Sequence, residues 1–419
     1  MNMQGKHGIQ LSPELIEILI LLFADDVVLV AESVVGLQCQ LNVLYNVARK
    51  LDLDVNLEKS NIVVFRNGGF LAAKEKWTYG QSQLKVVNMY KYLGIYLSTR
   101  LSFSHTQCDL ATKARNGTAA LFKMLWSIGE HSPSVFFKLF DAQIKPILTY
   151  GSEIWGLMQD QEEIERVHLS AIKRFLGLHP KAPRQVAYGE SGRYPLYICT
   201  YIRCIKFWLH LTSMGSDRYP NKAYKMLLSL QSQNFTTWAC SVRNTLFRYG
   251  FGVVWEAQGV GNVGLFIRTM KQRLIDCFEQ DWRTKLQQHD FFTIYSSYRQ
   301  SLSTRVYVLV TKNFFIRKAF AKFCVGMSPL RGSFLKYKQP LDNINCPFCS
   351  EKPETEVHFL FICPKYATLR AEFLPNKYTR NVTLFKLSHL LACKNETIIV
   401  NASIFVYKAL EIREKNMRV

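Results

Sequence analysis

Two adjacent carboxylates near the start of the chain, Asp25 and Asp26, are the first residues whose setting suggests chemistry. An apolar run lies on each side of them, Ile18–Phe23 and Val27–Ala31, and both runs are typical of short buried β-strands joined by a turn. Burying two neighbouring carboxylates is unfavourable unless a cation or hydrogen-bond donors meet them. The segment therefore suggests a site where divalent metal ions contact phosphates. An ordinary hairpin with Asp at a solvated turn explains these residues equally well.

Four potential metal ligands near the C-terminus follow the spacing C-x2-C-x8-H-x4-C: Cys346, Cys349, His358 and Cys363. Three thiolates and one imidazole can complete a tetrahedral zinc shell, as in structural zinc sites. A helix or turn beginning near Glu356 would present both His358 and Cys363. The alternative, unligated core cysteines beside an exposed His, requires four ligands at finger-like spacing to coincide by chance. We therefore expect a CCHC zinc knuckle with no role in the chemistry, and basic neighbours that contact phosphate: Lys352, Lys365 and Arg370.

The charge of the chain favours a polyanionic partner. The formal net charge is +21, but residues 1–60 carry four Lys or Arg against eight Asp or Glu, a net of −4, and the rest carries +25. The acidic pair thus precedes a long basic region, as expected for a protein that lies on nucleic acid. Anionic membrane is the competing partner, but there is no apolar run of transmembrane length and no signal-peptide pattern. Eleven scattered cysteines fit a reducing compartment, so we expect an intracellular protein, cytoplasmic or nuclear, and not a secreted one.

Several segments resemble, in order, the motifs of reverse transcriptases from non-LTR (LINE-type) retrotransposons. Leu22–Asp26 resembles the metal-binding hairpin, and Leu53–Ser60 resembles the following motif, a helix end leading into a strand at Ile62–Phe65. Tyr90–Gly94 is similar to the primer-contacting motif, and Tyr150–Trp155 to a thumb segment. The Cys/His cluster is similar to the knuckle that closes such proteins.

This resemblance implies particular roles for matching residues. Asp25 and Asp26 would hold Mg²⁺ or Mn²⁺, Lys59 would protonate the leaving pyrophosphate as general acid, and the primer-positioning turn would be formed by Tyr92, Leu93 and Gly94. The implied partners are an RNA template and a DNA primer or target, with no membrane.

One essential part of the family's active site is not found in this sequence. In this family an Asp upstream of the hairpin and the fingers complete the site, but only 24 residues precede Asp25 and none is Asp. Glu14 and Glu17 lie in or next to the first strand and are not suitable substitutes. We therefore expect the C-terminal fragment of an RNA-directed DNA polymerase, inactive alone, with the missing N-terminal part of the polyprotein as a further partner. The alternative is a non-catalytic, zinc-containing nucleic-acid-binding remnant of a retrotransposon, so the enzyme assignment stays open.

The predicted fold class is α+β. It comprises half of a polymerase palm (residues 1–100), a helical thumb-like segment (101–185), a basic, mainly helical connector (186–340), the zinc knuckle (341–375) and a partly helical tail (376–419). Ser33 begins a helix with an apolar face. Another begins at Ser132-Pro133 and is disturbed at Pro146. A third starts with a capping box between Asp160 and Glu163 and ends at Gly177.

Basic and aromatic residues alternate through the thumb-like and connector segments. Such a mixture can neutralise phosphates and stack on bases, although it can equally form the surface of an amphipathic helix. Because the region is so basic, we favour nucleic-acid contacts from nine residues: Lys113, Arg115, Lys123, Arg203, Lys206, Arg243, Arg268, Lys271 and Arg273.

Overall fold

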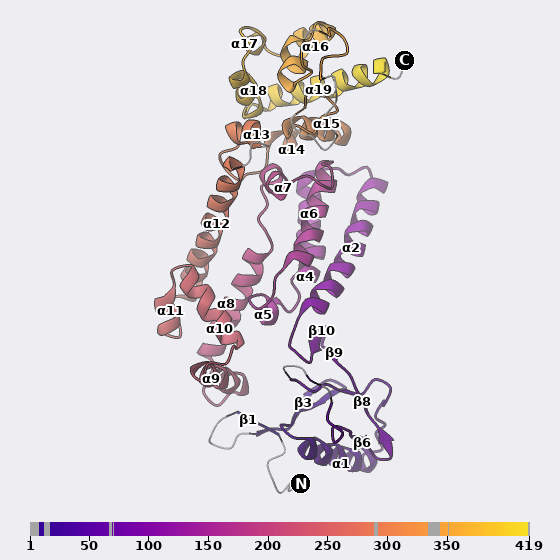
Figure 1. Ribbon diagram of the computed structural model, residues 1–419, viewed down its shortest axis with the longest axis vertical. Coiled ribbons are helices and arrows are strands. Elements are labelled where there is room, and N and C mark those ends of the chain that lie inside the picture. Colours follow the sequence, from indigo (N-terminus) through magenta and orange to yellow (C-terminus); the bar gives the residue numbers. More distant parts are fainter. Residues whose placement is uncertain are drawn as a thin grey trace. The chain divides into compact units, whose positions relative to one another are not determined.

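The computed structural model describes residues 8–11, 17–66, 69, 71–288, 292–333, 344–350 and 352–417 (Figure 1). The chain forms two compact units that alternate along the sequence. The first unit contains Met1–Asp109, Gly151–Asp160 and Thr200–Ile267, and the second contains Leu110–Tyr150, Gln161–Cys199 and Arg268–Val419. The domain boundaries expected from sequence, and the assignment of a palm and a thumb, stay predictions.

The described strands of the first unit form five separate two-stranded pairs. Four are antiparallel: β1 (Ile9–Gln10) with β2 (Glu17–Ile18), β3 (Ile20–Phe23) with β4 (Asp26–Leu29), β6 (Thr78–Tyr79) with β7 (Ser82–Gln83), and β9 (Met89–Tyr92) with β10 (Ile95–Ser98). The fifth pairs β5 (Asn61–Ile62) in parallel with β8 (Lys85–Val86). The strand predicted over Ile62–Phe65 is therefore wrong beyond Ile62, since β8 offers only two residues for pairing.

The hairpin of β3 and β4 confirms the predicted strand–turn–strand order, but the prediction that its strands are buried is wrong. The side chains of Ile20, Leu21, Leu22, Phe23 and Val27 are between 43% and 68% exposed. A two-stranded hairpin has two faces to cover, and among the described residues only its far end, at Leu29, packs against the core of the unit.

That core forms around α1 (Val34–Lys50), the helix predicted to begin at Ser33. The Ser33 hydroxyl accepts a hydrogen bond from the Gly36 N–H at 3.0 Å and caps the helix. Leu41 packs with Ile62, Trp77 and Leu84. The core thereby fixes the strand pairs on either side of the 53–60 segment. The remaining helices of this unit are α5 (Ser152–Trp155), most of α8 (Tyr197–Ser213), α9 (Tyr219–Ser232), α10 (Trp238–Arg248) and α11 (Gly252–Glu256).

The second unit is helical in its described residues. Most of α2 (Ser104–Ser127) belongs to it, followed by α3 (Pro133–Leu139), the π-helical turn η1 (Phe140–Ile144) and α4 (Lys145–Leu148). The predicted disturbance at Pro146 is confirmed, because proline cannot donate the usual bond and the preceding turn widens. Helix α6 (Glu162–Leu176) ends as predicted at Gly177, whose φ is 70°. Its predicted capping box is wrong: Gln161 is the N-cap residue and its side chain makes no capping bond, so Asp160 lies one residue too early.

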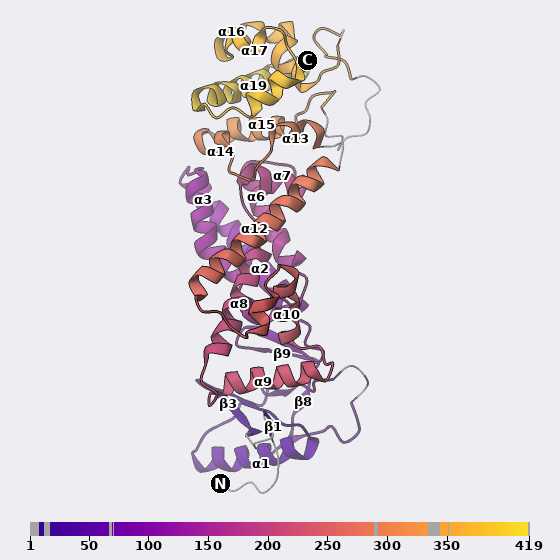
Figure 2. The ribbon, with the colours of Figure 1, turned by 90° about the vertical axis from the view of Figure 1, so that its left-hand side faces the viewer.

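The later helices of the second unit are α7 (Arg184–Ser191), most of α12 (Val263–Gln287), α13 (Thr293–Tyr298), α14 (Val306–Val310) and α15 (Phe314–Cys324). They are followed by the π-helical turn η3 (His358–Ile362), the 3-10 turn η4 (Pro364–Tyr366), α16 (Ala367–Phe373), α17 (Asn376–Thr379), α18 (Leu384–Leu391) and α19 (Glu396–Met417). Helix α19 lies along α15, as both views of the ribbon show (Figures 1 and 2). Phe359 of η3 packs between Phe323 of α15 and Phe405 of α19, so the segment that carries the predicted metal ligands is attached to this helix pair.

Candidate metal centre and carboxylate hairpin

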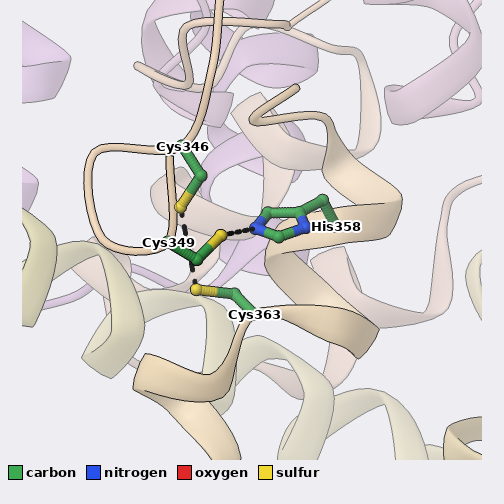
Figure 3. Close-up of side chains that lie close together, drawn as sticks. All are labelled: Cys346, Cys349, His358 and Cys363. Atoms are coloured by element: carbon green, nitrogen blue, oxygen red, sulfur yellow. Dashed lines mark hydrogen bonds between the residues drawn. The ribbon is translucent and has the colours of Figure 1, made fainter. Parts of the chain in front are cut away.

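The structure brings the four predicted ligands at the C-terminal end together (Figure 3). The ligand atoms of Cys346, Cys349, His358 and Cys363 all lie within 4.8 Å of one another. The Cys346 and Cys363 sulfurs are 3.8 Å apart, and the Cys349 sulfur is 3.3 Å from Nε2 of His358. Zinc bonds of ~2.3 Å to sulfur and ~2.0 Å to nitrogen give tetrahedral edges of about 3.8 Å and about 3.5 Å. The cluster therefore has the size of a Cys₃His metal site.

Two local structures present these ligands. The first is the turn after Cys346, in which the Ser350 N–H donates to the Cys346 carbonyl and the Cys346 N–H donates to the Lys352 carbonyl. The second is η3, where the Cys363 N–H donates to the His358 carbonyl at 2.8 Å. A bond from residue i+5 to residue i defines a π-helical turn. An α-helical turn would point residues five apart in different directions, so the wider turn is what brings His358 and Cys363 onto one side.

Burial shifts the pKa values of the two kinds of ligand in opposite directions. It lowers the pKa of the His358 imidazole, which favours the neutral form that a metal ligand requires. It raises the pKa of the Cys363 thiol to about 12, and the neighbouring sulfurs of Cys346 and Cys349 act in the same direction. Three thiolates this close repel one another, so the cluster favours a divalent cation as the partner that would stabilise all three.

Two buried arginines hold the cluster in place; sequence reasoning gave Arg370 a different role and missed Arg413. Arg370, expected to contact phosphate, is instead buried and donates to the carbonyls of Leu360 and Cys363 at 2.9 and 2.8 Å. Arg413 of α19 makes a two-bond ion pair with Glu354, a residue that is 1% exposed. Of the three predicted phosphate contacts, only Lys352 and Lys365 are exposed. A lone Arg in sequence carries no sign of whether its partner is a carbonyl or a phosphate.

The two carboxylates of the first unit lie at the tip of the β3–β4 hairpin. Phe23 pairs with Asp26, so Ala24 and Asp25 form a two-residue turn, and both Asp side chains are exposed. Ala24 has a φ of 53°, a conformation that costs an L-residue with a side chain roughly 1 kcal/mol. Within the described ranges no third carboxylate, Cys or His joins Asp25 and Asp26 in a group that could hold a cation. The metal-binding role predicted for Asp25 and Asp26 therefore stays a prediction.

The other residues assigned by resemblance lie on neighbouring turns of the same unit. Lys59 is exposed, and its carbonyl accepts a hydrogen bond from the Tyr90 hydroxyl at 2.9 Å. Tyr92 ends β9, and Leu93 and Gly94 have φ values of 46° and 83° in the two-residue turn that leads into β10. Positive φ at both positions is typical of the tight turn of a hairpin. The Tyr90 bond therefore ties the Lys59 segment to this turn, a link with no sequence signal.

The nine basic residues predicted to contact nucleic acid are divided between the two units. Arg203 is half-buried and lies 3.6 Å from Glu153, and Arg115 lies 3.9 Å from Glu163. The first unit carries Arg203, Lys206 and Arg243, and the second carries Lys113, Arg115, Lys123, Arg268, Lys271 and Arg273. All except Arg203 are exposed.

Comparison with known proteins relates the chain to transposons. It is 30% identical over 141 residues to a probable RNA-directed DNA polymerase from transposon X-element of Drosophila melanogaster, over 33% of this chain and 14% of the relative. It is 28% identical over 164 residues to a putative transposon-derived protein of Caenorhabditis elegans, over 37% of this chain and 56% of the relative. The chain thus spans about a seventh of one relative and just over half of the other. About a third of the chain is thus distantly similar to proteins of transposon origin, one of them described as a probable RNA-directed DNA polymerase.

No protein-family model and no solved structure matches the chain. None of the helices formed by the described residues is both long enough and apolar enough to cross a membrane.

Proposed function

We propose that this chain is the C-terminal part of a LINE-type RNA-directed DNA polymerase, which binds template and primer and contributes half of the nucleotidyl-transfer site. The observation that carries the proposal is the two-residue turn that exposes Asp25 and Asp26 at the tip of an apolar hairpin. Support comes from the order of the following motifs and from the similarity to a transposon-encoded polymerase.

The residues of this chain have distinct parts in the proposed reaction. Asp25 and Asp26 bind divalent cations, which when bound activate the primer hydroxyl and neutralise charge on the leaving pyrophosphate. Lys59, whose side chain is free to reach solvent, donates a proton to that pyrophosphate. The β9–β10 turn at Tyr92, Leu93 and Gly94 positions the end of the primer, and the Tyr90 bond holds the Lys59 segment beside this hairpin.

We infer that a preceding segment of the same polyprotein completes this site. A cation pair needs carboxylates from more than one strand, and the described residues supply them from one turn only. The exposed apolar side chains of β3 and β4 support the same inference, because burying Leu22 and Phe23 against a further strand would stabilise the hairpin by roughly 1.5–3 kcal/mol for each side chain fully covered.

The Cys₃His cluster is proposed to bind one structural zinc ion. Four protein ligands leave no open position for substrate, so the ion would stabilise the loop and η3 and take no part in the chemistry. Lys352 and Lys365 beside it are exposed and would contact the nucleic-acid backbone.

Primer extension on an annealed RNA template tests the catalytic part. We expect no extension by this chain with Mg²⁺ or Mn²⁺, and extension once a fingers and palm segment from a transposon-encoded polymerase is joined in front of it. That restored activity should disappear in Asp25→Asn and persist in Glu372→Gln, an exposed carboxylate of α16. Activity of the unmodified chain that depends on Asp25 would contradict the fragment assignment.

The alternative function is a non-catalytic nucleic-acid-binding protein derived from a retrotransposon. The observation that favours it is the absence of a third carboxylate near Asp25 and Asp26 in the described part of the chain. It would be preferred if nucleic acid binds with the same affinity to Asp25→Asn and if no upstream segment restores extension.

A further inference from the structure

The second unit contains a large cavity that none of the predicted site residues lines. Its volume is about 830 Å³, and its walls are the end of α2, one side of α6 with the loop that follows, and one side of α15. Phe314, Lys318 and Lys322 are spaced by four residues, so they form a single stripe along α15. Cavities of 300–1,000 Å³, roughly, are the size that binds small organic ligands.

The cavity carries an excess of positive charge. Six cationic side chains line it, Arg166, Lys173, Arg174, Arg184, Lys318 and Lys322, against the carboxylates of Glu130 and Glu162. Glu162 is occupied by a two-bond ion pair with Arg184, and Glu130 accepts from the Ser132 N–H. Arg166 pairs with Glu163 at 2.8 Å. Among the described residues no carboxylate lies within ion-pair distance of the other four cations that line the cavity: Lys173, Arg174, Lys318 and Lys322.

This crowding of cations is unfavourable without an anion. Lys173, Lys318 and Lys322 are all half-buried, and the stem of Lys318 packs over Gly177, where any larger residue would collide with it. Burial lowers the pKa of Lys173 and the nearby Arg184 lowers it further; burial likewise lowers the pKa of Lys322, with Lys318 adding to the effect. A phosphate between these ammonium groups would relieve both effects.

Aromatic rings also line the cavity. Trp126 packs edge-on against Phe314 with ring centres 5.0 Å apart and against His131 at 4.3 Å. Trp126 is nevertheless 43% exposed, which leaves part of the indole open to the cavity. An aromatic face beside a cluster of cations is the arrangement that proteins use to stack a base and bind its phosphate.

We propose that this cavity binds one unpaired nucleotide of a single-stranded nucleic acid, with its phosphate between Lys173, Lys318 and Lys322 and its base against Trp126. The inference rests on the proposed function only in assuming that the chain binds nucleic acid. It assigns the strand a position that neither the Asp25 hairpin nor the nine basic residues predicted from the sequence provide.

The test is fluorescence titration of the full chain with a single-stranded oligonucleotide that carries one 2-aminopurine, alongside a duplex of the same sequence. Stacking on Trp126 quenches 2-aminopurine, so we expect the quench to be lost in Trp126→Ala and kept in Trp126→Phe. Single-strand affinity should fall roughly 5- to 100-fold in Trp126→Ala, and duplex affinity should stay within about twofold.

The phosphate contacts are tested with Lys318→Gln/Lys322→Gln. The slope of log affinity against log salt for the single strand should become shallower by roughly 0.7 for each phosphate contact removed. The matched control is Lys377→Gln/Lys408→Gln, which removes the same charge from two exposed lysines that lie over aromatic rings elsewhere in the unit. Thermal unfolding of each variant confirms that it is folded.

The outcomes separate the two proposals. If the wild-type chain binds neither the single strand nor the duplex, the proposed function fails. If it binds both, but the cavity variants behave like the control, the proposed function stands and the cavity inference is overturned. If a free mononucleotide binds as tightly as the oligonucleotide, and with the same dependence on Trp126 and Lys318, the cavity serves free nucleotides and the strand assignment is overturned.

Discussion

Replacement of Glu354 should destabilise the C-terminal part of the second unit more than replacement of an exposed residue would. Its carboxylate accepts from Nε and Nη2 of Arg413 at 2.6 and 2.8 Å and from the Arg331 N–H at 2.8 Å. It lies just ahead of the helical turn that carries His358, so it connects the ligand segment to α19. Although burial disfavours a charge on Arg413, the hydrogen bonds to Glu354 raise the pKa of the guanidinium above its usual value.

The expected loss of stability follows from the groups that Glu354→Ala leaves without a hydrogen-bond partner. The Arg413 side chain is only 10% exposed, so it would keep a nearly buried charge with no counter-ion, and the Arg331 N–H would lose its acceptor. Breaking a buried pair on one side costs about 3–5 kcal/mol. For a domain of 150–250 residues, roughly 2–4 °C accompanies each kcal/mol, so the expected decrease in melting temperature is about 6–20 °C.

Urea unfolding monitored by circular dichroism, with zinc in excess, measures this change. Glu372→Ala on α16 is the control, because that carboxylate is exposed and should change the free energy of unfolding by less than about 0.5 kcal/mol. The double variant Glu354→Leu/Arg413→Met should recover most of the loss, since an apolar pair often replaces a buried ion pair at little cost. A Glu354→Ala variant as stable as the control would refute the reasoning that this pair connects the two segments.

Three further predictions concern the metal and the nucleic acid. Metal analysis of the purified chain should give about one zinc, and Cys349→Ser should lower both the metal content and the helicity. Affinity for single-stranded RNA or DNA should fall steeply and linearly on a log–log plot as salt is raised, whereas a flat response would exclude backbone-dominated binding. Because burial lowers the pKa values of Lys173 and Lys322, single-strand affinity should decline as the pH is raised towards the ordinary lysine value of 10.5, and this decline should be shallower in Lys173→Gln/Lys322→Gln. Without ligand the sign is opposite: the unfolded chain binds these protons more tightly, so stability should rise over the same window. The other charged or titratable groups that line the cavity are Glu130, His131, Glu162, Arg166, Arg174, His179, Arg184 and Lys318.

Local signals in the sequence predicted several individual helix features. Ser33 is the N-cap of α1, Gly177 adopts the positive φ that ends α6, and the helix around Pro146 is interrupted by a π-helical turn. Each of these features depends on one residue and its own backbone, so a single sequence carries the information. The predicted metal ligands also came together, because a tight turn and one widened helical turn fix all four.

Burial could not be predicted in the same way. The apolar runs around Asp25 suggested buried strands, and the hairpin formed, yet Leu22 and Phe23 remain exposed in the structure. Alternation and β-branched residues indicate that a strand needs a partner surface, but not which segment provides it. The Asp160 capping box failed for a related reason: the spacing fitted, but the helix began one residue later at Glu162.

The cavity between α2, α6 and α15 could not be predicted from the sequence. Its cations come from segments more than 130 residues apart, and in sequence Lys173, Lys318 and Lys322 look like ordinary surface lysines of amphipathic helices. Only the fold shows that these three half-buried lysines line the same cavity as Trp126. Like charges placed together at a cost to the unbound protein are better explained by a ligand than by stability.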